Sequence, residues 1–172
     1  ALKAIMNKAV SWKYLTVSPF SEMKNAKVVQ VPPKYFTKAE FEKLLLLVEE
    51  NWLRGAIVFA ASTGIRRGEL INLQWSDVDL ARQVMTIRSS GDFKVKGDKS
   101  RIVPLSLVAM GVITQMKRDS DCPYVFHKGG KRLWPNWVTQ LFRSYVKKAG
   151  LWDKRLHWHN LRSSFASWLV SD

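Results

Sequence analysis

The segment TGIRRGEL, residues 63–70, decides how this sequence is interpreted. A helical pattern over residues 53–62 stops there, because Gly64 can adopt the left-handed conformation that ends a helix. A short helix is expected over residues 67–73, which places Arg66 at its N-terminus. Backbone N–H groups at such a position favour an anion, and a guanidinium adds a bidentate fork for phosphate. Taken alone, an ordinary turn with two solvated arginines explains the segment more often.

Downstream of this turn we expect three short strands, over residues 83–88, 92–97 and 101–105. The segment of residues 97–100 would join the last two strands into a hairpin. Side chains alternate between the two faces of a strand, so inward packing of Phe93 would direct its neighbours outward. The hairpin would then present a row of cations. They are Lys94, Lys96, Lys99 and Arg101. Taken alone, an ordinary charged hairpin kept soluble by its lysines explains the segment more often.

A third segment, HNLRSSFAS, covers residues 159–167. Its helical spacing puts His159 and Arg162 side by side. When both are charged they repel each other, and an anion between them would relieve that repulsion. A histidine bonded to a backbone carbonyl beside an arginine in a surface salt bridge is an equally reasonable interpretation.

The remaining pattern is mainly helical. Thr37 and Glu40 form a capping box that starts a helix. Further helices are expected over residues 106–118 and 135–149, and from about His157, with a short extended piece over residues 124–126. The fold class is therefore α+β, mainly α-helical, with one small three-stranded antiparallel sheet.

Composition points to a polyanionic partner. The 172 residues include 28 Lys and Arg and 14 Asp and Glu, which gives a net charge of +14. Nucleic acid is the first partner to consider, and a membrane surface is a weaker one because no basic amphipathic helix dominates.

The single cysteine, Cys122, excludes an internal disulfide and fits a reducing, cytoplasmic setting. No secretory signal or apolar run of membrane-spanning length occurs.

In this order, the T-G-x-R-x-x-E-L, K-G-x-K-x-R-x-V-P-L and H-x-L-R segments resemble the tyrosine recombinases and integrases. The resemblance covers about residues 34–172 and implies that family's catalytic-domain fold. It identifies residues 1–20 as the last helix of a core-binding domain, 21–34 as a linker and 35–172 as an incomplete catalytic domain. Glu69 matches the acidic residue of the first box. The implied catalytic residues are Arg66, Lys96, His159 and Arg162.

The sequence departs from the family pattern in three places, and one of them is the later His or Trp of the family, which is not present. Ser163 stands where many members have a second histidine after the arginine. The family's nucleophilic tyrosine follows the H-x-L-R box, whereas the four tyrosines here all precede it. Both chain ends look like cuts, so we expect a fragment of a longer protein that is inactive alone. The tyrosines are Tyr14, Tyr35, Tyr124 and Tyr145.

The resemblance implies site-specific recombination of double-stranded DNA through a 3′-phosphotyrosine, by a protein that assembles as a tetramer on two DNA sites. Charge stabilisation by the arginines and proton transfer by lysine require no metal or other cofactor. We expect a phage or mobile-element integrase acting in the bacterial cytoplasm on the nucleoid, with no membrane or small-molecule partner. Further DNA contacts are expected from Lys94, Lys99, Arg101, Lys128, Lys131, Arg132, Asn136, Gln140 and Arg143.

Two other functions stay open. A DNA-binding protein could retain the recombinase fold without catalysis. A basic RNA-binding domain is disfavoured because no stacking motif of the RRM type is present.

Overall fold

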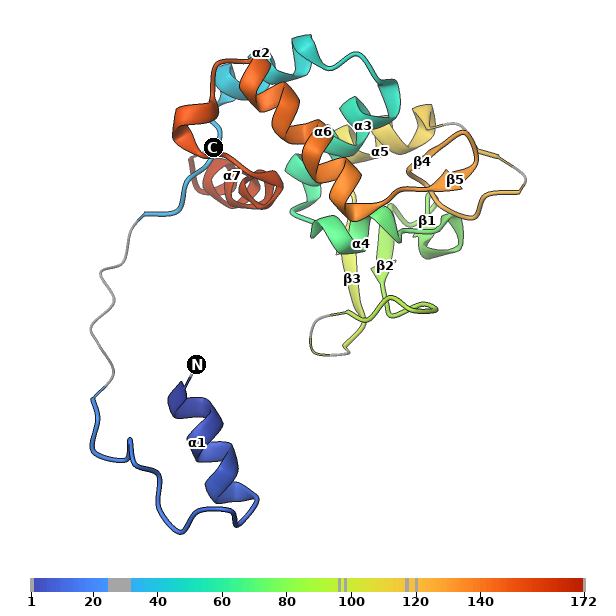
Figure 1. The fold of residues 1–172 in the computed structure, drawn as a ribbon. Helices are drawn as coiled ribbons and strands as arrows, with labels where there is room; N and C mark the ends of the chain where they lie inside the picture. Colours follow the sequence, from blue (N-terminus) through green and yellow to red (C-terminus); the bar gives the residue numbers. More distant parts are fainter. Residues whose placement is uncertain are drawn as a thin grey trace. The chain divides into compact units, whose positions relative to one another are not determined.

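The computed structural model describes residues 2–24, 32–95, 97, 99–116, 118–119 and 121–171 (Figure 1). The chain divides into two compact units, Ala1–Pro32 and Pro33–Asp172. In the first unit, helix α1 (Leu2–Ser11) is followed by turns, and the Lys3 ammonium donates to the Met23 carbonyl at 2.6 Å. The assignment of residues 1–20 to a core-binding domain and of residues 21–34 to a linker stays a prediction.

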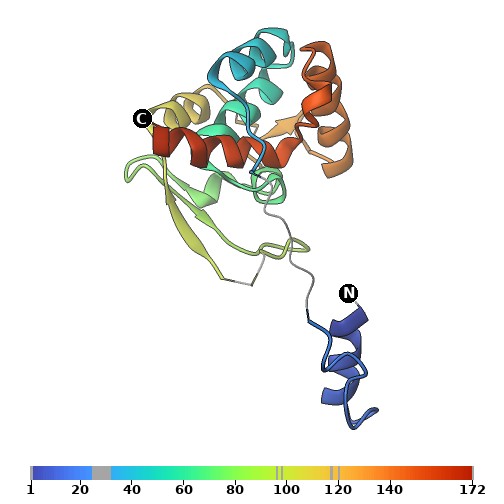
Figure 2. The same ribbon diagram turned by 90° about the vertical axis from the view of Figure 1, so that its left-hand side faces the viewer.

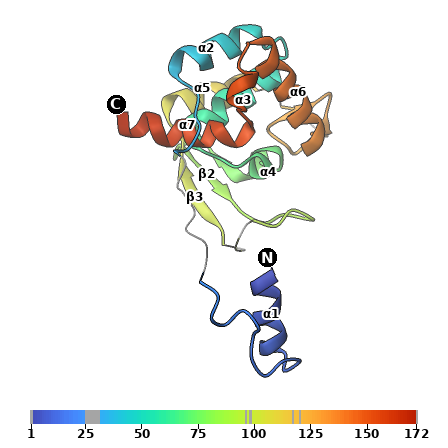
Figure 3. The same cartoon turned by 60° about the vertical axis from the view of Figure 1, so that its left-hand side comes forward.

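The second unit is built mainly from helices. Helix α3 is buried along most of its length, as expected for a helix that is apolar on nearly every face. It packs against α5 and α7, while α2 packs against α6 (Figure 3). In the described parts of the chain, no helix is long and apolar enough to cross a bilayer. The helices are α2 (Lys38–Leu47), α3 (Asn51–Thr63), α4 (Arg67–Ile71), α5 (Leu107–Gln115), α6 (Pro135–Lys148) and α7 (Trp158–Ser171), with 3-10 turns η1 (Trp75–Asp77) and η2 (Trp152–Lys154).

The predicted capping box at the start of α2 is confirmed. The Glu40 N–H donates to the Thr37 hydroxyl at 3.2 Å, and the Thr37 N–H donates to the Glu40 carboxylate at 3.0 Å. Two donors that a helix start leaves unpaired are thereby satisfied. The Lys154 ammonium also binds Glu40, which ties η2 to the start of α2.

A three-stranded antiparallel sheet is present, as predicted, but one of its strands differs. The order is β1 (Val78–Asp79), β2 (Val84–Ile87) and β3 (Arg101–Pro104). Strand β2 pairs with β3 from Val84 opposite Pro104 to Ile87 opposite Arg101, and Figure 2 shows these two strands side by side below the helices. The predicted strand over residues 92–97 is wrong over residues 92–95, and β1 takes its place in the sheet.

The reason lies in a turn that comes earlier than expected. The N–H groups of Ser90 and Phe93 each donate to the other residue's carbonyl at 3.0 Å, and Gly91 between them has a φ of +54°. This reversal uses the hydrogen-bonding groups that would otherwise join a strand, so β3 pairs with β2. The predicted inward packing holds, since Val95 is buried and Phe93 packs against the core, while Lys94 is exposed. Lys96 and Asp98 lie outside the described residues.

A second, two-stranded sheet was not predicted. Strands β4 (His127–Lys128) and β5 (Lys131–Arg132) pair antiparallel across Gly129 and Gly130. Both glycines have positive φ, +56° and +73°, which is the backbone that a two-residue hairpin turn requires. The Gly129-Gly130 pair was therefore the sequence signal for this hairpin.

Candidate active site

The turn between α3 and α4 needs glycine for two reasons. Gly64 ends α3 with φ +63°, in the left-handed region. A Cβ atom built on it would lie 2.6 Å from Cδ1 of Phe165, which belongs to α7. Only a residue without a side chain lets α7 approach the turn this closely. The turn that leads to Arg66 is therefore packed directly against α7.

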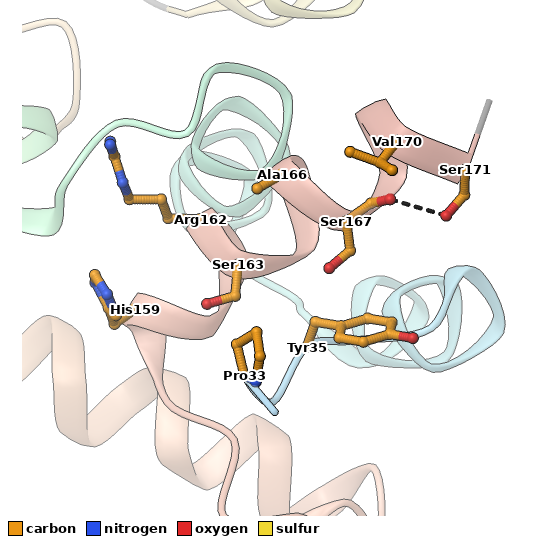
Figure 4. A pocket seen from close by; sticks show the side chains of 9 residues that line it. All are labelled: Pro33, Tyr35, His159, Arg162, Ser163, Ala166, Ser167, Val170 and Ser171. Atoms are coloured by element: carbon orange, nitrogen blue, oxygen red, sulfur yellow. Dashed lines mark hydrogen bonds between the residues drawn. The ribbon is translucent and has the colours of Figure 1, made fainter. Parts of the chain in front are cut away.

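The same contact brings Arg162 to this turn. Its Nη1 atom donates to the Gly64 carbonyl, two residues before Arg66. His159 lies one helical turn earlier and lines the same pocket of about 610 Å³. Figure 4 shows His159 and Arg162 at one end of this pocket, directed to the same side of α7. The structure thus brings His159 and Arg162 together and places Arg162 on the segment that leads to Arg66.

One wall of the pocket is formed by Pro33 and Tyr35. The neighbouring backbone is fixed to α7 by three hydrogen bonds. Asn160 Nδ2 donates to the Lys34 carbonyl (2.7 Å), the Phe36 N–H donates to the buried Ser164 hydroxyl (2.8 Å), and Trp168 Nε1 donates to the Phe36 carbonyl (3.1 Å). These bonds set the position of the wall relative to His159 and Arg162.

Arg66 is held by a buried carboxylate. Its backbone N–H donates to Glu69 Oε2 and its Nη1 to Glu69 Oε1, each at 3.0 Å. Arg101 of β3 donates two further bonds to the same carboxylate, of 2.9 and 2.6 Å. The Glu69 side chain is 2% exposed, while the side chains of Arg66 and Arg101 are 39% and 34% exposed. Glu69 therefore orients both arginines and leaves part of each guanidinium open to solvent.

This network also changes the acidity of Glu69. Burial raises the pKa of its carboxyl, but hydrogen bonds from Arg101 and Arg66 outweigh burial and hold the pKa below its ordinary value. Glu69 is thus a carboxylate at neutral pH. A carboxylate with four donors leaves the arginines with a smaller net positive charge than two free guanidinium groups, yet with fixed positions.

The other predicted catalytic residue, Lys96, lies outside the described residues. Within the hairpin segment, Lys94 and Lys99 are exposed, as a DNA contact requires. Arg101 differs from them because its guanidinium is bonded to Glu69. The sequence pattern grouped Arg101 with the outward lysines, and its pairing with Glu69 was missed because the two residues are 32 positions apart.

The predicted DNA contacts on α6 lie on one exposed face. Asn136, Gln140 and Arg143 are all exposed, opposite the buried Val138 and Phe142. These contacts stay predictions, because exposure alone does not show a ligand.

Two of the three predicted basic residues of the β4–β5 hairpin, Lys128 and Arg132, have intramolecular partners. Lys128 lies 4.9 Å from the centre of the Trp137 ring, and Arg132 lies 5.7 Å from that of Tyr124 and donates to Asn72 Oδ1. Lys131 is exposed. Their DNA contacts likewise stay predictions.

Sequence reasoning also missed Arg67. Its Nη1 atom donates to the Thr139 hydroxyl of α6, so α4 and α6 are joined next to the candidate site. The adjacent arginines of the TGIRRGEL segment therefore have different partners: Glu69 for Arg66 and Thr139 for Arg67. The candidate site as a whole consists of Arg66, Arg162, His159 and the fixed turn. These groups are suited to an oxyanion with several charged oxygens.

Comparison with known proteins gives a consistent result. Residues 34–172 match the model of the phage integrase family. The tyrosine recombinase XerA of Pyrococcus furiosus is 28% identical over 159 residues, which cover 86% of this chain and 52% of that protein. The chain thus spans about half the length of this curated relative.

Solved structures agree with the family match. The crystal structure of XerA recombinase superposes with a TM-score of 0.65 at 28% identity, covering 83% of this chain and 54% of that one. The structure of a lambda integrase tetramer bound to a Holliday junction superposes with a TM-score of 0.69 at 21% identity, covering 96% of this chain and 51% of that one. At this identity the second likeness concerns the fold alone.

Proposed function

The chain belongs to the phage integrase family, and on that premise we propose that the intact protein is a site-specific DNA recombinase. It would cleave and rejoin DNA strands through a covalent 3′-phosphotyrosine. The observation that carries this proposal is the shared pocket of His159 and Arg162, with Arg162 bonded to the turn that leads to Arg66. These contacts support a site at which one phosphate would meet residues that are far apart in the sequence.

Each residue has a distinct role in this proposal. Arg66 and Arg162 hold the two non-bridging oxygens of the scissile phosphate and stabilise the charge that develops there. His159 donates a hydrogen bond to the phosphate and assists proton movement on the side of the nucleophile. Lys96 protonates the departing 5′-oxygen. The fixed turn reduces the reorganisation that this stabilisation would otherwise need.

The attacking oxygen comes, in this proposal, from a tyrosine outside residues 1–172. The Tyr145 hydroxyl donates to Glu50 at 2.7 Å, and this bond together with burial raises the pKa of Tyr145. Tyr35 lines the pocket, but Figure 4 shows its hydroxyl directed away from His159. The ring of Tyr124 faces Arg132. The Tyr145 hydroxyl is thus bonded to Glu50, and the Tyr35 hydroxyl points away from His159.

The proposed substrate is double-stranded DNA, and we propose that the intact protein acts as a tetramer on two sites. The lambda integrase tetramer on a Holliday junction, which shares this fold, supports such an assembly. The net charge of +14 supports capture of the DNA backbone. As a DNA recombinase of phage or mobile-element origin, the protein would act in the cytoplasm, on the nucleoid.

The test is covalent capture. The intact protein is incubated with a nicked duplex that carries its recombination site, and the products are separated on a denaturing gel. We expect an adduct with the intact protein, none with the 172-residue chain, and a strong loss in the Arg162→Ala variant of the intact protein. An adduct from the 172-residue chain would return an internal tyrosine to consideration. No adduct from the intact protein would contradict the recombinase assignment and favour a DNA-binding role.

A further inference from the structure

A second pocket adjoins the first and shares His159 with it. It has a volume of about 360 Å³ and lies between α4, α6 and the start of α7. Each of the three elements supplies at least one side chain that is basic or can become so. The lining residues are Arg67, Gly68, Thr139, Arg143, His157, Trp158 and His159.

The pocket is lined by basic side chains and by no acidic one. Its seven lining residues are basic or neutral, with two arginines and two of the three histidines of the chain. Arg143 is exposed and, among the residues that the structure describes, has no acidic partner. The guanidinium groups of Arg67 and Arg143, which line one cavity, repel each other unless an anion lies between them. The pocket is therefore suited to an anionic group.

The walls of the pocket are set before any ligand arrives. Arg67 Nη1 donates to the Thr139 hydroxyl, which itself donates to the Pro135 carbonyl at 2.8 Å. This chain of bonds fixes the Arg67 guanidinium against α6, and its other N–H groups have no partner among the described residues, so they can serve a ligand. Trp158 is 4% exposed and packs edge-on against Phe142, with ring centres 5.1 Å apart. The pocket thus rests on the core.

We propose that this pocket binds the DNA backbone phosphate next to the one held by His159 and Arg162. The inference rests on the proposed function and adds a second anion site to it. Successive phosphates of a DNA strand follow one another about every 3.4 Å along the helix axis. Two adjoining pockets that share the wall residue His159 would therefore receive neighbouring phosphates of one strand. Arg143 is the ligand whose replacement should disturb the fold least, because it is exposed and has no acidic partner among the described residues.

The experiment removes one charge from the protein and one from the DNA. Arg143→Gln in the intact protein is compared with Lys43→Gln, which makes the same charge change at an exposed position of α2 outside both pockets. The substrate is the nicked duplex with a neutral methylphosphonate placed in turn at each phosphate that flanks the scissile one. The rate of covalent adduct formation is measured for every combination, and thermal melts verify that each variant is folded.

We expect Arg143→Gln to slow adduct formation about tenfold or more on the normal duplex, the scale of one charged hydrogen bond. At one flanking position the methylphosphonate should slow adduct formation by the wild type and by Lys43→Gln alike. It should slow Arg143→Gln little beyond the loss that this variant already shows on the normal duplex. Equal losses for Arg143→Gln and wild type at both positions would overturn the proposal, as would an unchanged rate on the normal duplex. If the wild type forms no adduct on the normal duplex, the recombinase assignment itself fails, and this inference fails with it.

Discussion

The two segments that carry the predicted catalytic cations are held in very different ways. In the α3–α4 turn, Arg66 is bonded to the buried carboxylate of Glu69, and Arg162 reaches the carbonyl of Gly64. In the connection between β2 and β3, Lys94 and Lys99 are exposed and, among the described residues, lack an acidic partner. One segment is positioned by the protein, whereas the described lysines of the other face solvent.

This difference separates two ways of using positive charge. A guanidinium fixed by buried groups can stabilise a transition state without reorganising, because its orientation is already set. An exposed lysine loses side-chain entropy when it binds, yet it attracts a polyanion over a distance and in many orientations. We therefore expect substitutions in the turn to change stability and chemistry, and substitutions of the exposed Lys94 and Lys99 to change DNA affinity alone.

The largest effect on stability is expected from Glu69→Gln. The change removes the negative charge that four N–H donors share, and it leaves Arg66 and Arg101 without their acidic partner. We expect the free energy of unfolding to fall by about 2–3 kcal/mol, below the full value for a buried pair because both arginines are partly exposed. Chemical denaturation measures this. Glu42→Gln, at an exposed position of α2, is the matched control and should be nearly neutral.

The same variant has a defined pH dependence. Because the pKa of Glu69 is lowered in the folded state, its contribution is present above the ordinary value of 4.5 and is lost as pH falls through the lower, folded value. The stability difference between wild type and Glu69→Gln should therefore shrink as pH falls below about 4.5. A difference that stays constant through this range would show that the carboxylate charge is not what holds the turn.

A smaller effect is expected from Gly64→Ala. The new Cβ would meet the Phe165 ring at 2.6 Å on a backbone with φ +63°. We expect a loss of about 2 kcal/mol, or a fall in Tm of about 4–8 °C for a chain of this size. Gly111→Ala in α5 is the control, since its Cβ would meet nothing within 4 Å and alanine favours a helix. Equal Tm values for the two variants would contradict the close packing of α7 on the turn.

The smallest effect on stability is expected in the connection. Lys94→Gln should change the free energy of unfolding by less than about 0.5 kcal/mol, because the side chain is exposed. Titration of a labelled duplex at several salt concentrations should show a slope of log affinity against log salt that is shallower by about 1, the loss of one phosphate contact. A slope equal to that of Lys43→Gln would remove Lys94 from the DNA-contacting face.

Local signals in the sequence predicted most of the fold. The capping box of Thr37 and Glu40, the stop at Gly64 and the periodicity of α6 all act between residues a few positions apart. The predicted strand over residues 92–97 was misassigned because Gly91 reverses the chain at residues 90–93, and the alternation of Phe93, Lys94 and Val95 is not restricted to strands. Alternation shows which side chains are buried, but pairing depends on where the turn falls.

The site was predictable only in its residue types. The three motifs predicted Arg66, His159 and Arg162 as site residues, and that assignment stays a prediction, whereas several bonds around the site join distant parts of the chain. Arg101 reaches Glu69 across 32 positions, Arg67 reaches Thr139 across 72, and Arg162 reaches Gly64 across 98. Such contacts depend on tertiary packing, which no local pattern encodes.

The central claim is that Arg66 and Arg162 hold one and the same phosphate. The most direct test is a double-mutant cycle on covalent adduct formation by the intact protein, with Arg66→Ala, Arg162→Ala and the double variant. Each single change should slow the reaction by about 10²–10³-fold, and the double variant should lose far less than the product of the two factors, because both groups act on the same charge. A double variant whose loss equals that product would show that the two arginines act independently and would contradict the account.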